Sequence, residues 1–193
     1  MKPSIMFLAC ALPLAGCGES DVEMKNASVG EVTQEMRRKA DERFINPGRW
    51  EQKATLVSID APGMPPEAKE MMGKAMGQAQ VHDVCLTAEQ AKSPREDFFT
   101  GANKNCRYEH FNWGSGKIDL KLNCEHPNAK QTMELTGKYQ PNSYTMDMVA
   151  TNTGSGPSGE MVMKMRVEAR RVGNCTAEQA KAAEAAEAAG GRS

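Results

Sequence analysis

The sequence predicts a mainly β (α+β) domain: a curved antiparallel β meander of about six or seven strands with one packed helix, a helical N-terminal segment and a C-terminal helical tail. Three observations predict this fold. Apolar and polar residues alternate with a period of two along residues 106–124, 131–151 and 161–170, as in strands with one buried face. The turn sequences Gly114-Ser115-Gly116 and Pro141-Asn142 separate the strands of two hairpins. Four cysteines lie beside or within these elements, which is typical of small exported domains.

The first 16 residues have the features of a secretory signal peptide. One basic residue, Lys2, precedes an apolar stretch over residues 5–15 that is too short to span a bilayer as a helix. The stretch ends in Leu14-Ala15-Gly16-Cys17, which resembles the lipobox of bacterial lipoproteins. This resemblance implies cleavage before Cys17 and attachment of fatty acids such as palmitate there. We therefore expect residues 1–16 to be a leader and Cys17 to be the lipidation site.

The residue that follows Cys17 predicts to which membrane the lipoprotein is sorted. Gly18, in place of aspartate, resembles the default pattern for sorting lipoproteins to the outer membrane. Each buried methylene of a lipid anchor contributes about 0.8 kcal/mol, so several acyl chains hold a protein at a membrane. We expect a cell-envelope protein that is anchored to the outer membrane and faces the periplasm, with the membrane as a partner through its lipid.

The charge balance excludes one class of partner. The chain has 24 Lys and Arg residues against 25 Asp and Glu residues, a formal net charge of −1. A nucleic-acid-binding protein needs a basic patch, so no nucleic acid partner is expected. Aromatic residues make up 5% of the chain and methionine occurs 14 times, so much of the core must be thioether and aliphatic.

The 193 residues divide into a leader (1–16), a lipid anchor and tether (17–45), a β-rich domain (46–175) and an Ala/Glu-rich helical tail (176–193). Apolar residues recur in the tether at steps of three and four, which favours a helix; they are Val29, Val32, Met36, Ala40 and Phe44. This helix is either a docking element or part of the tether, and we predict the tether. The tail has high helix propensity but little apolar face, so an exposed helix is expected.

The first half of the domain combines strands with one amphipathic helix. Residues 49–59 predict a strand in which Trp50 is the first large anchor. Two prolines then begin a helix, predicted over residues 65–79, whose apolar stripe we expect to pack on the sheet. A short strand is predicted over residues 81–86.

The first hairpin predicts a register. If Trp113 faces Lys117 across the loop Gly114-Ser115-Gly116, Cys106 lies directly opposite Cys124. On the same apolar face this register pairs Tyr108 with Leu122, His110 with Leu120 and Asn112 with Ile118. The other face is charged, as a sheet with one buried face requires.

The cysteines predict two disulfides. Cys10 leaves with the leader and Cys17 carries lipid, so four cysteines remain, with three possible connectivities. Directly opposed cysteines lie within disulfide reach, which predicts Cys106–Cys124 and leaves Cys85–Cys175. The string Thr-Ala-Glu-Gln-Ala-Lys follows a cysteine twice, at residues 87–92 and 176–181, with the spacing of a helix capping box.

A second hairpin and a last strand continue the meander. With Gln140 facing Ser143, the predicted pairs are Tyr139 with Tyr144, Leu135 with Met148 and Met133 with Ala150. In the last strand the residues of one face alternate with polar and charged residues; they are Met161, Met163, Met165, Val167 and Ala169.

Several segments stand out beside the leader and the methionine-rich strands: Pro47-Gly48-Arg49-Trp50-Glu51, Gly63-Met64-Pro65-Pro66, Val84-Cys85-Leu86-Thr87, the Cys106 and Cys124 pair, and Arg171-Val172-Gly173-Asn174-Cys175. In this order they resemble the bacterial domain-of-unknown-function family 3617, over roughly residues 45–176. The resemblance implies an exported lipoprotein with a small disulfide-bonded β domain. It implies no activity, substrate or catalytic residue.

The methionines are the candidate binding residues. Met146, Met148, Met161, Met163 and Met165 share one predicted sheet face. Thioethers suit copper(I), so periplasmic copper binding is one hypothesis. The alternatives are that these residues form core, because methionine fills irregular gaps, or line an apolar cleft between the sheet and the helix at 65–79 that takes a hydrophobic ligand.

The remaining residues carry no recognisable catalytic motif. His82, His110 and His126 are scattered without ligand spacing, and His110 is expected on the core face. There is no nucleophile elbow, phosphate loop or zinc-binding helix motif, so no catalytic or metal residue and no cofactor is predicted. The leading hypothesis is a non-catalytic envelope lipoprotein that binds a hydrophobic small molecule or an envelope protein. The alternatives are copper(I) binding through the methionines and an unrecognised hydrolase.

Overall fold

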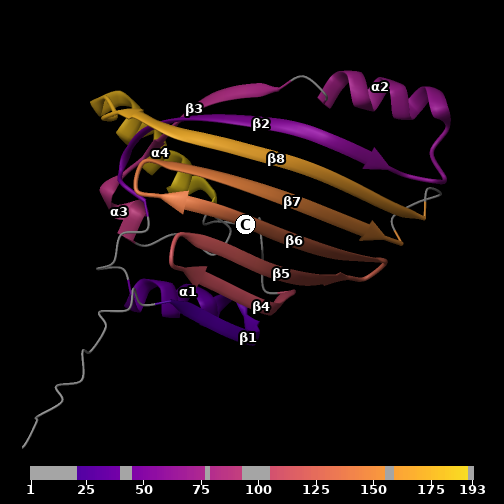
Figure 1. Cartoon of the computed structure of the whole chain (residues 1–193), viewed down its shortest axis with the longest axis horizontal. Helices are drawn as coiled ribbons and strands as arrows, with labels where there is room; N and C mark the ends of the chain where they lie inside the picture. The colour runs from indigo at the N-terminus through magenta and orange to yellow at the C-terminus, as the bar shows by residue number, and fades with distance from the viewer. Residues whose placement is uncertain (1–20, 40–44, 77–78, 93–104, 155–158, 191–193) are drawn as a thin grey trace, which may run out of the picture.

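An antiparallel sheet of eight strands dominates the fold (Figure 1). The computed structural model describes residues 21–39, 45–76, 79–92, 105–154 and 159–190. The strands are β1 (Val22–Ser28), β2 (Gly48–Asp60), β3 (Gln80–Leu86), β4 (Cys106–Gly114), β5 (Lys117–His126), β6 (Ala129–Gln140), β7 (Ser143–Thr153) and β8 (Glu160–Gly173). The helices are α1 (Val29–Arg38), α2 (Pro66–Met76), α3 (Ala88–Lys92) and α4 (Ala177–Gly190). The mainly β class is confirmed, although the strand number is slightly higher than predicted. The expected leader and Cys17 lie outside the described residues.

The strand order is β1-β4-β5-β6-β7-β8-β2-β3. Strands β4 to β8 are the predicted meander. In the β6–β7 hairpin, Tyr139 lies opposite Tyr144, Leu135 opposite Met148 and Met133 opposite Ala150, which confirms that register. The last strand, β8, then pairs along its length with β2, so the two ends of the β domain lie side by side.

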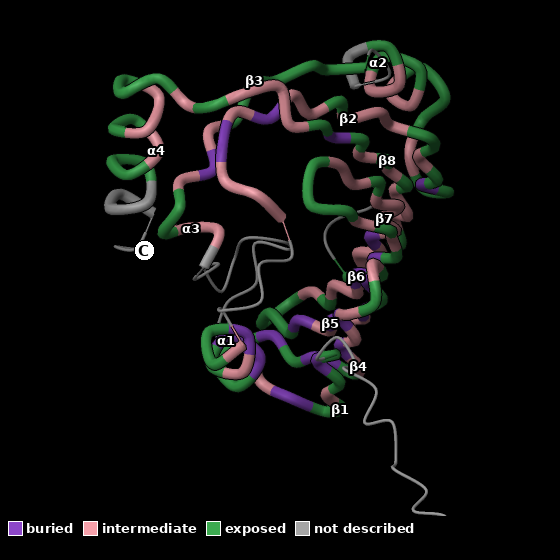
Figure 2. Tube along the Cα trace, turned by 60° about the vertical axis from the view of Figure 1, so that its left-hand side comes forward, coloured by how far each residue is buried: buried purple, intermediate pink, exposed green. Residues whose placement is uncertain are grey.

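The sheet has one apolar face and one charged face. It curves around α1, α3 and α4, which lie on its apolar, concave side (Figure 2). The opposite face carries cross-strand ion pairs: Arg166 binds Asp147 through two nitrogen–oxygen contacts of 2.8 and 2.9 Å, and Arg170 binds Glu51 at 2.8 Å. The hydrogen bond from Arg166 lowers the pKa of the Asp147 carboxyl. These ion pairs are exposed to water and keep the outer face polar. The apolar surface of the sheet therefore lies on the inner face.

The N-terminal segment is an integral part of the fold, which corrects the predicted tether. Strand β1 pairs with β4 at the edge of the sheet. Helix α1 begins in a capping box in which Ser28 Oγ accepts from the Glu31 backbone N–H at 3.2 Å and the Glu31 carboxylate accepts from the Ser28 N–H at 2.7 Å. Its buried side chains Val29, Val32 and Met36 cover the β1 end of the sheet.

Helix α2, predicted to pack on the sheet, does not cover it. It lies beside the last part of β2, in line with β3 along that edge of the sheet, and contacts chiefly β2 (Figure 1). None of its described side chains is buried, and Met71 is 73% exposed. The prediction was wrong because the apolar stripe of α2 is narrow and the helix contains a glycine, Gly73, whereas α1 offers a better-formed apolar face. Within the described ranges no helix is long and apolar enough to cross a membrane.

The first hairpin contains a β-bulge that the predicted register lacked. Cys106 lies opposite Cys124 and Tyr108 opposite Leu122, as predicted, but the register shifts between Tyr108 and His110. Beyond the bulge Phe111 pairs with Leu120, Trp113 pairs with Ile118, and the turn shortens to Ser115-Gly116, both with positive φ, as in a type I′ turn. The bulge puts Tyr108, Phe111 and Trp113 on the buried face together. His110 is therefore turned outward, where its Nε2 lies 3.2 Å from Asp119 Oδ1.

Candidate functional site

A pocket lies between the two hydrophobic clusters of the inner face. The larger cluster joins α1 and β1 to β4, β5 and β6, and the smaller one is built on Trp50, Leu86 and Ala169. Helix α1 covers one end of the concave sheet while α3 and α4 stand beside the other (Figure 2). A single helix is too narrow to cover so wide a sheet, and a pocket of about 570 Å³ opens between the covered ends. This volume falls within the range of small-molecule sites.

The pocket lining is apolar and aromatic. The described lining residues come from six strands, from α3 and α4, and from the segment before β2. They are Ile45, Trp50, Gln52, Val84, Cys85, Leu86, Gln90, Trp113, Leu135, Tyr139, Tyr144, Met146, Met148, Val167, Ala183 and Ala186. None of these residues is charged, so the pocket offers burial and a few neutral polar groups to a ligand.

Four aromatic residues form an arc across one end of the pocket. Trp50 and Tyr144 have ring centroids 5.5 Å apart, and so have Trp113 and Tyr139. The two tyrosines are direct cross-strand neighbours on β6 and β7, which joins the two pairs. Trp50 reaches Tyr144 diagonally over β8, where the residue opposite Tyr144 is the small Ala169, which packs with both rings. The indole N–H of Trp50 donates to the carbonyl oxygen of residue 46 at 3.0 Å, which holds the ring in place.

Gln52 and Tyr144 form a neutral polar pair within this apolar pocket lining. The Gln52 side-chain N–H donates a hydrogen bond to the Tyr144 hydroxyl oxygen. Burial of the phenol raises the pKa of Tyr144 to about 12, because the charged phenolate would lose its hydration there. Tyr144 is therefore a neutral hydroxyl donor throughout the physiological pH range.

This pKa predicts a loss of stability at high pH. The unfolded chain releases the phenolic proton above about pH 10, whereas the folded chain keeps it up to about pH 12, so rising pH favours unfolding in this interval. We expect wild type to lose about 2 kcal/mol more than Tyr144→Phe between pH 9 and 11.5, measured by urea unfolding. Other titrating groups are common to both proteins and cancel in the difference. Equal losses in the two proteins would show that Tyr144 titrates normally.

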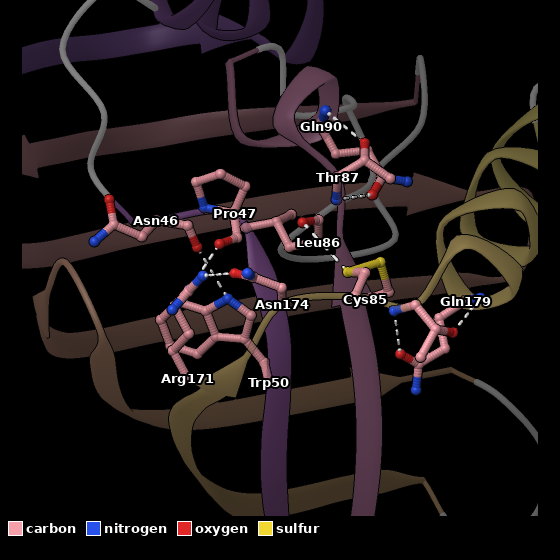
Figure 3. Close-up of a disulfide and its surroundings, with 12 residues drawn as sticks. Asn46, Pro47, Trp50, Cys85, Leu86, Thr87, Gln90, Arg171, Asn174 and Gln179 are labelled. Atoms are coloured by element: carbon pink, nitrogen blue, oxygen red, sulfur yellow. Dashed lines mark hydrogen bonds between the residues drawn. A yellow bond between two sulfur atoms is a disulfide. The ribbon is translucent and has the colours of Figure 1, made fainter.

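A disulfide holds one wall of the pocket. Cys85 on β3 is bonded to Cys175, which lies just before α4 (Figure 3). The repeated string forms two matching capping boxes: Thr87 exchanges hydrogen bonds with Gln90 at the start of α3, and Thr176 with Gln179 at the start of α4. The tail helix, expected to be exposed, is thus anchored beside the sheet, and its Ala183 and Ala186 line the pocket.

The predicted methionines divide into two groups. Met146 and Met148 on β7 line the pocket. Met161, Met163 and Met165 lie on the same face of β8 but are half-buried and lie outside the pocket lining. Met165 lies directly opposite Met148, so the thioethers form a strip that leads away from the aromatic arc along the sheet.

The structure adds pocket residues that the sequence reasoning did not select. Trp50 and Gln52 meet the tyrosine pair only because β8 pairs with β2 across more than a hundred residues. Trp113 reaches Tyr139 through the pairing of β4 with β5 and of β5 with β6. The Tyr139–Tyr144 pair was the one available signal, since it was already predicted as a cross-strand contact. Within the described ranges, no group of three His, Cys, Asp or Glu side chains is placed to hold a metal ion.

Three of the segments that carry the family resemblance meet at one corner beside the pocket (Figure 3). The Arg171 Nε donates to the Pro47 carbonyl oxygen at 2.7 Å, and its Nη2 donates to Asn174 Oδ1 at 2.6 Å. At Gly48, φ is +143° and a Cβ would lie 2.4 Å from the Gly173 carbonyl oxygen, so only glycine fits. These motif residues therefore build the corner rather than line the pocket.

A family model described as "Protein of unknown function (DUF3617)" matches residues 45–175 of the chain. The chain belongs to this family. The DUF3617 match begins at Ile45, which lines the pocket, and ends at Cys175, whose disulfide anchors α4. It thus spans β2 to β8, while β1, α1 and α4 lie outside it. No curated protein and no solved structure matches the chain.

Proposed function

We propose that this protein is a non-catalytic lipoprotein of the bacterial cell envelope that binds a hydrophobic small molecule in the pocket on its concave face. The observation that carries the proposal is the pocket itself: about 570 Å³, with a described lining that is mostly aromatic, aliphatic and thioether and includes no charged side chain. Such a lining stabilises a ligand by removing its apolar surface from water, at about 25 cal/mol per Å².

The proposed location rests on the disulfides and the leader. Both cysteine pairs of the domain are bonded, which is typical of oxidising compartments outside the cytoplasm. The leader ending at Cys17 supports export and a lipid anchor. We place the protein at the outer membrane, facing the periplasm, where an anchored binding domain meets ligands that partition between membrane and water.

Methionines support the same function. Met146 and Met148 form part of the pocket lining, and a flexible, polarisable thioether adapts to ligands of varied shape. The half-buried Met165 continues this surface beyond the lining.

Filling the pocket from its helical wall is expected to abolish binding. Ala183→Trp directs a large side chain from α4 into the pocket, so the affinity for the neutral apolar dye N-phenyl-1-naphthylamine should fall at least tenfold, measured by dye fluorescence. Ala182→Trp is the matched control, because Ala182 lies on the same helix but is exposed and outside the lining. Equal affinity in the two variants would place the dye elsewhere and reject the pocket.

Native mass spectrometry of the chain from residue 18, exported to a bacterial periplasm without its anchor, tests for a resident ligand. A reproducible extra mass of lipid size supports the proposal. An extra mass of one copper ion, lost in Met146→Leu with Met148→Leu, contradicts it in favour of metal binding by the methionines.

A further inference from the structure

The polar pair in the pocket points to the chemical class of the ligand, and this inference rests on the proposed function. Because the Tyr144 oxygen accepts from Gln52, the phenolic O–H remains as a donor, and the part of the chain that the structure describes provides no acceptor for it. The Gln52 side-chain carbonyl likewise meets no donor among the described residues. One free donor and one free acceptor thus lie side by side in an apolar lining.

Both residues are half-buried and line the open pocket, so a ligand that covers them takes their polar groups out of water. A covered polar group without a partner is costly, so the pair favours a ligand that satisfies it. A hydroxyl group both accepts from Tyr144 and donates to Gln52, and a carbonyl oxygen accepts from Tyr144. An ionised head does not fit, because none of the described lining side chains carries a compensating charge and burial of an unpaired ion is strongly unfavourable.

The two ends of the pocket differ in chemistry, which orients the ligand. The polar pair lies at the aromatic arc, where Gln52 and Tyr144 adjoin Trp50. Along β7 the lining continues through Met146 and Met148, and Gly137, opposite Met146, leaves room for the Met146 side chain, whose Cγ would lie 3.0 Å from a Cβ at that position. A hydrocarbon tail fits over the methionines while its head reaches the arc.

We infer that the pocket takes an uncharged single-chain amphiphile, with its hydroxyl or carbonyl head on Tyr144 and Gln52 and its hydrocarbon tail along Met146 and Met148. The ligand class therefore includes long-chain alcohols and esters and excludes ionised fatty acids and phospholipids. The head sets the direction of binding, whereas the tail supplies most of the affinity.

Three ten-carbon probes test this assignment on the chain from residue 18, which retains every described residue: 1-decanol, methyl decanoate and decane. Affinities are read from tryptophan fluorescence, since Trp50 and Trp113 line the pocket. Tyr144→Phe removes the donor and keeps the ring, so the affinity for decanol should fall about three- to tenfold while that for decane stays the same. Comparing wild type with the variant for each probe cancels the hydration of that probe, and the difference between the probes isolates the contact with the head.

Thr145→Val is the matched control. It removes a hydroxyl from the next residue of β7, on the exposed outer face, and should change none of the affinities. Decanoate at pH 8, where it is ionised, should bind at least tenfold more weakly than methyl decanoate.

The outcomes separate this inference from the proposed function. If no probe binds, the proposed function fails and the ligand class fails with it. If the probes bind but Tyr144→Phe weakens decanol and decane equally, the apolar pocket stands and the head position is wrong. If decanoate binds as tightly as its ester, the pocket does not select neutral ligands and the inference is overturned.

Discussion

Replacing Cys85 and Cys175 together with alanine is expected to lower the free energy of unfolding by about 2–5 kcal/mol. The disulfide joins residues 90 positions apart, so its loss releases a long loop in the unfolded chain. In the chain-entropy model closing such a loop contributes between about 4 and 5 kcal/mol, whereas the Cys106–Cys124 bond, with a separation of 18, contributes about 3 kcal/mol. Urea unfolding under non-reducing conditions measures both variants.

The same replacement is expected to weaken ligand binding, because Cys175 is the anchor of α4. Ala183 and Ala186 reach the pocket from that helix, which among the described strands contacts chiefly β3, the strand that carries Cys85. Dye affinity should fall several-fold in the folded Cys85→Ala, Cys175→Ala protein. In the Cys106→Ala, Cys124→Ala protein it should be unchanged, since that bond lies outside the pocket. Unchanged affinity in both would mean that α4 keeps its place without the bond.

Replacing Phe111 with alanine is expected to cost about 3–5 kcal/mol, the usual range for a buried phenylalanine. Phe111 is 0% exposed and packs edge-on against Tyr108, with a centroid distance of 5.3 Å, and beside Trp113. Deleting its ring leaves a cavity in the larger cluster. Urea unfolding of Phe111→Ala and wild type measures the difference.

The neighbouring His110→Ala is the matched comparison, with an expected cost below about 1 kcal/mol. Its side chain is 30% exposed, and its Nε2 contacts the exposed carboxylate of Asp119. Without the bulge, the predicted register puts His110 in the core and turns Phe111 outward. A large cost for His110→Ala with a small one for Phe111→Ala would therefore contradict the bulge and restore the simple register.

The sequence by itself determined the parts of the fold that depend on neighbouring strands. The β6–β7 register follows from a two-residue turn and from alternation on both strands, because strands joined by a tight turn have almost no freedom to slip. The opposition of Cys106 and Cys124 follows in the same way from the first hairpin. Membership of DUF3617 was also visible, because its motif segments can be recognised in the sequence without knowledge of the corner that they build.

Tertiary structure decided the bulge, the helix that covers the core and the pocket. Each of these depends on which side chains gain most from burial once the whole sheet has formed. The bulge in β4 forms because Phe111 and Trp113 gain more from burial than His110 and Asn112, which the period of two alone does not weigh. Helix α1, and not α2, covers the core, since β1 carries it to the sheet edge. The pocket exists only because β8 pairs with β2, which brings Trp50 and Gln52 to Tyr144 from more than ninety residues away.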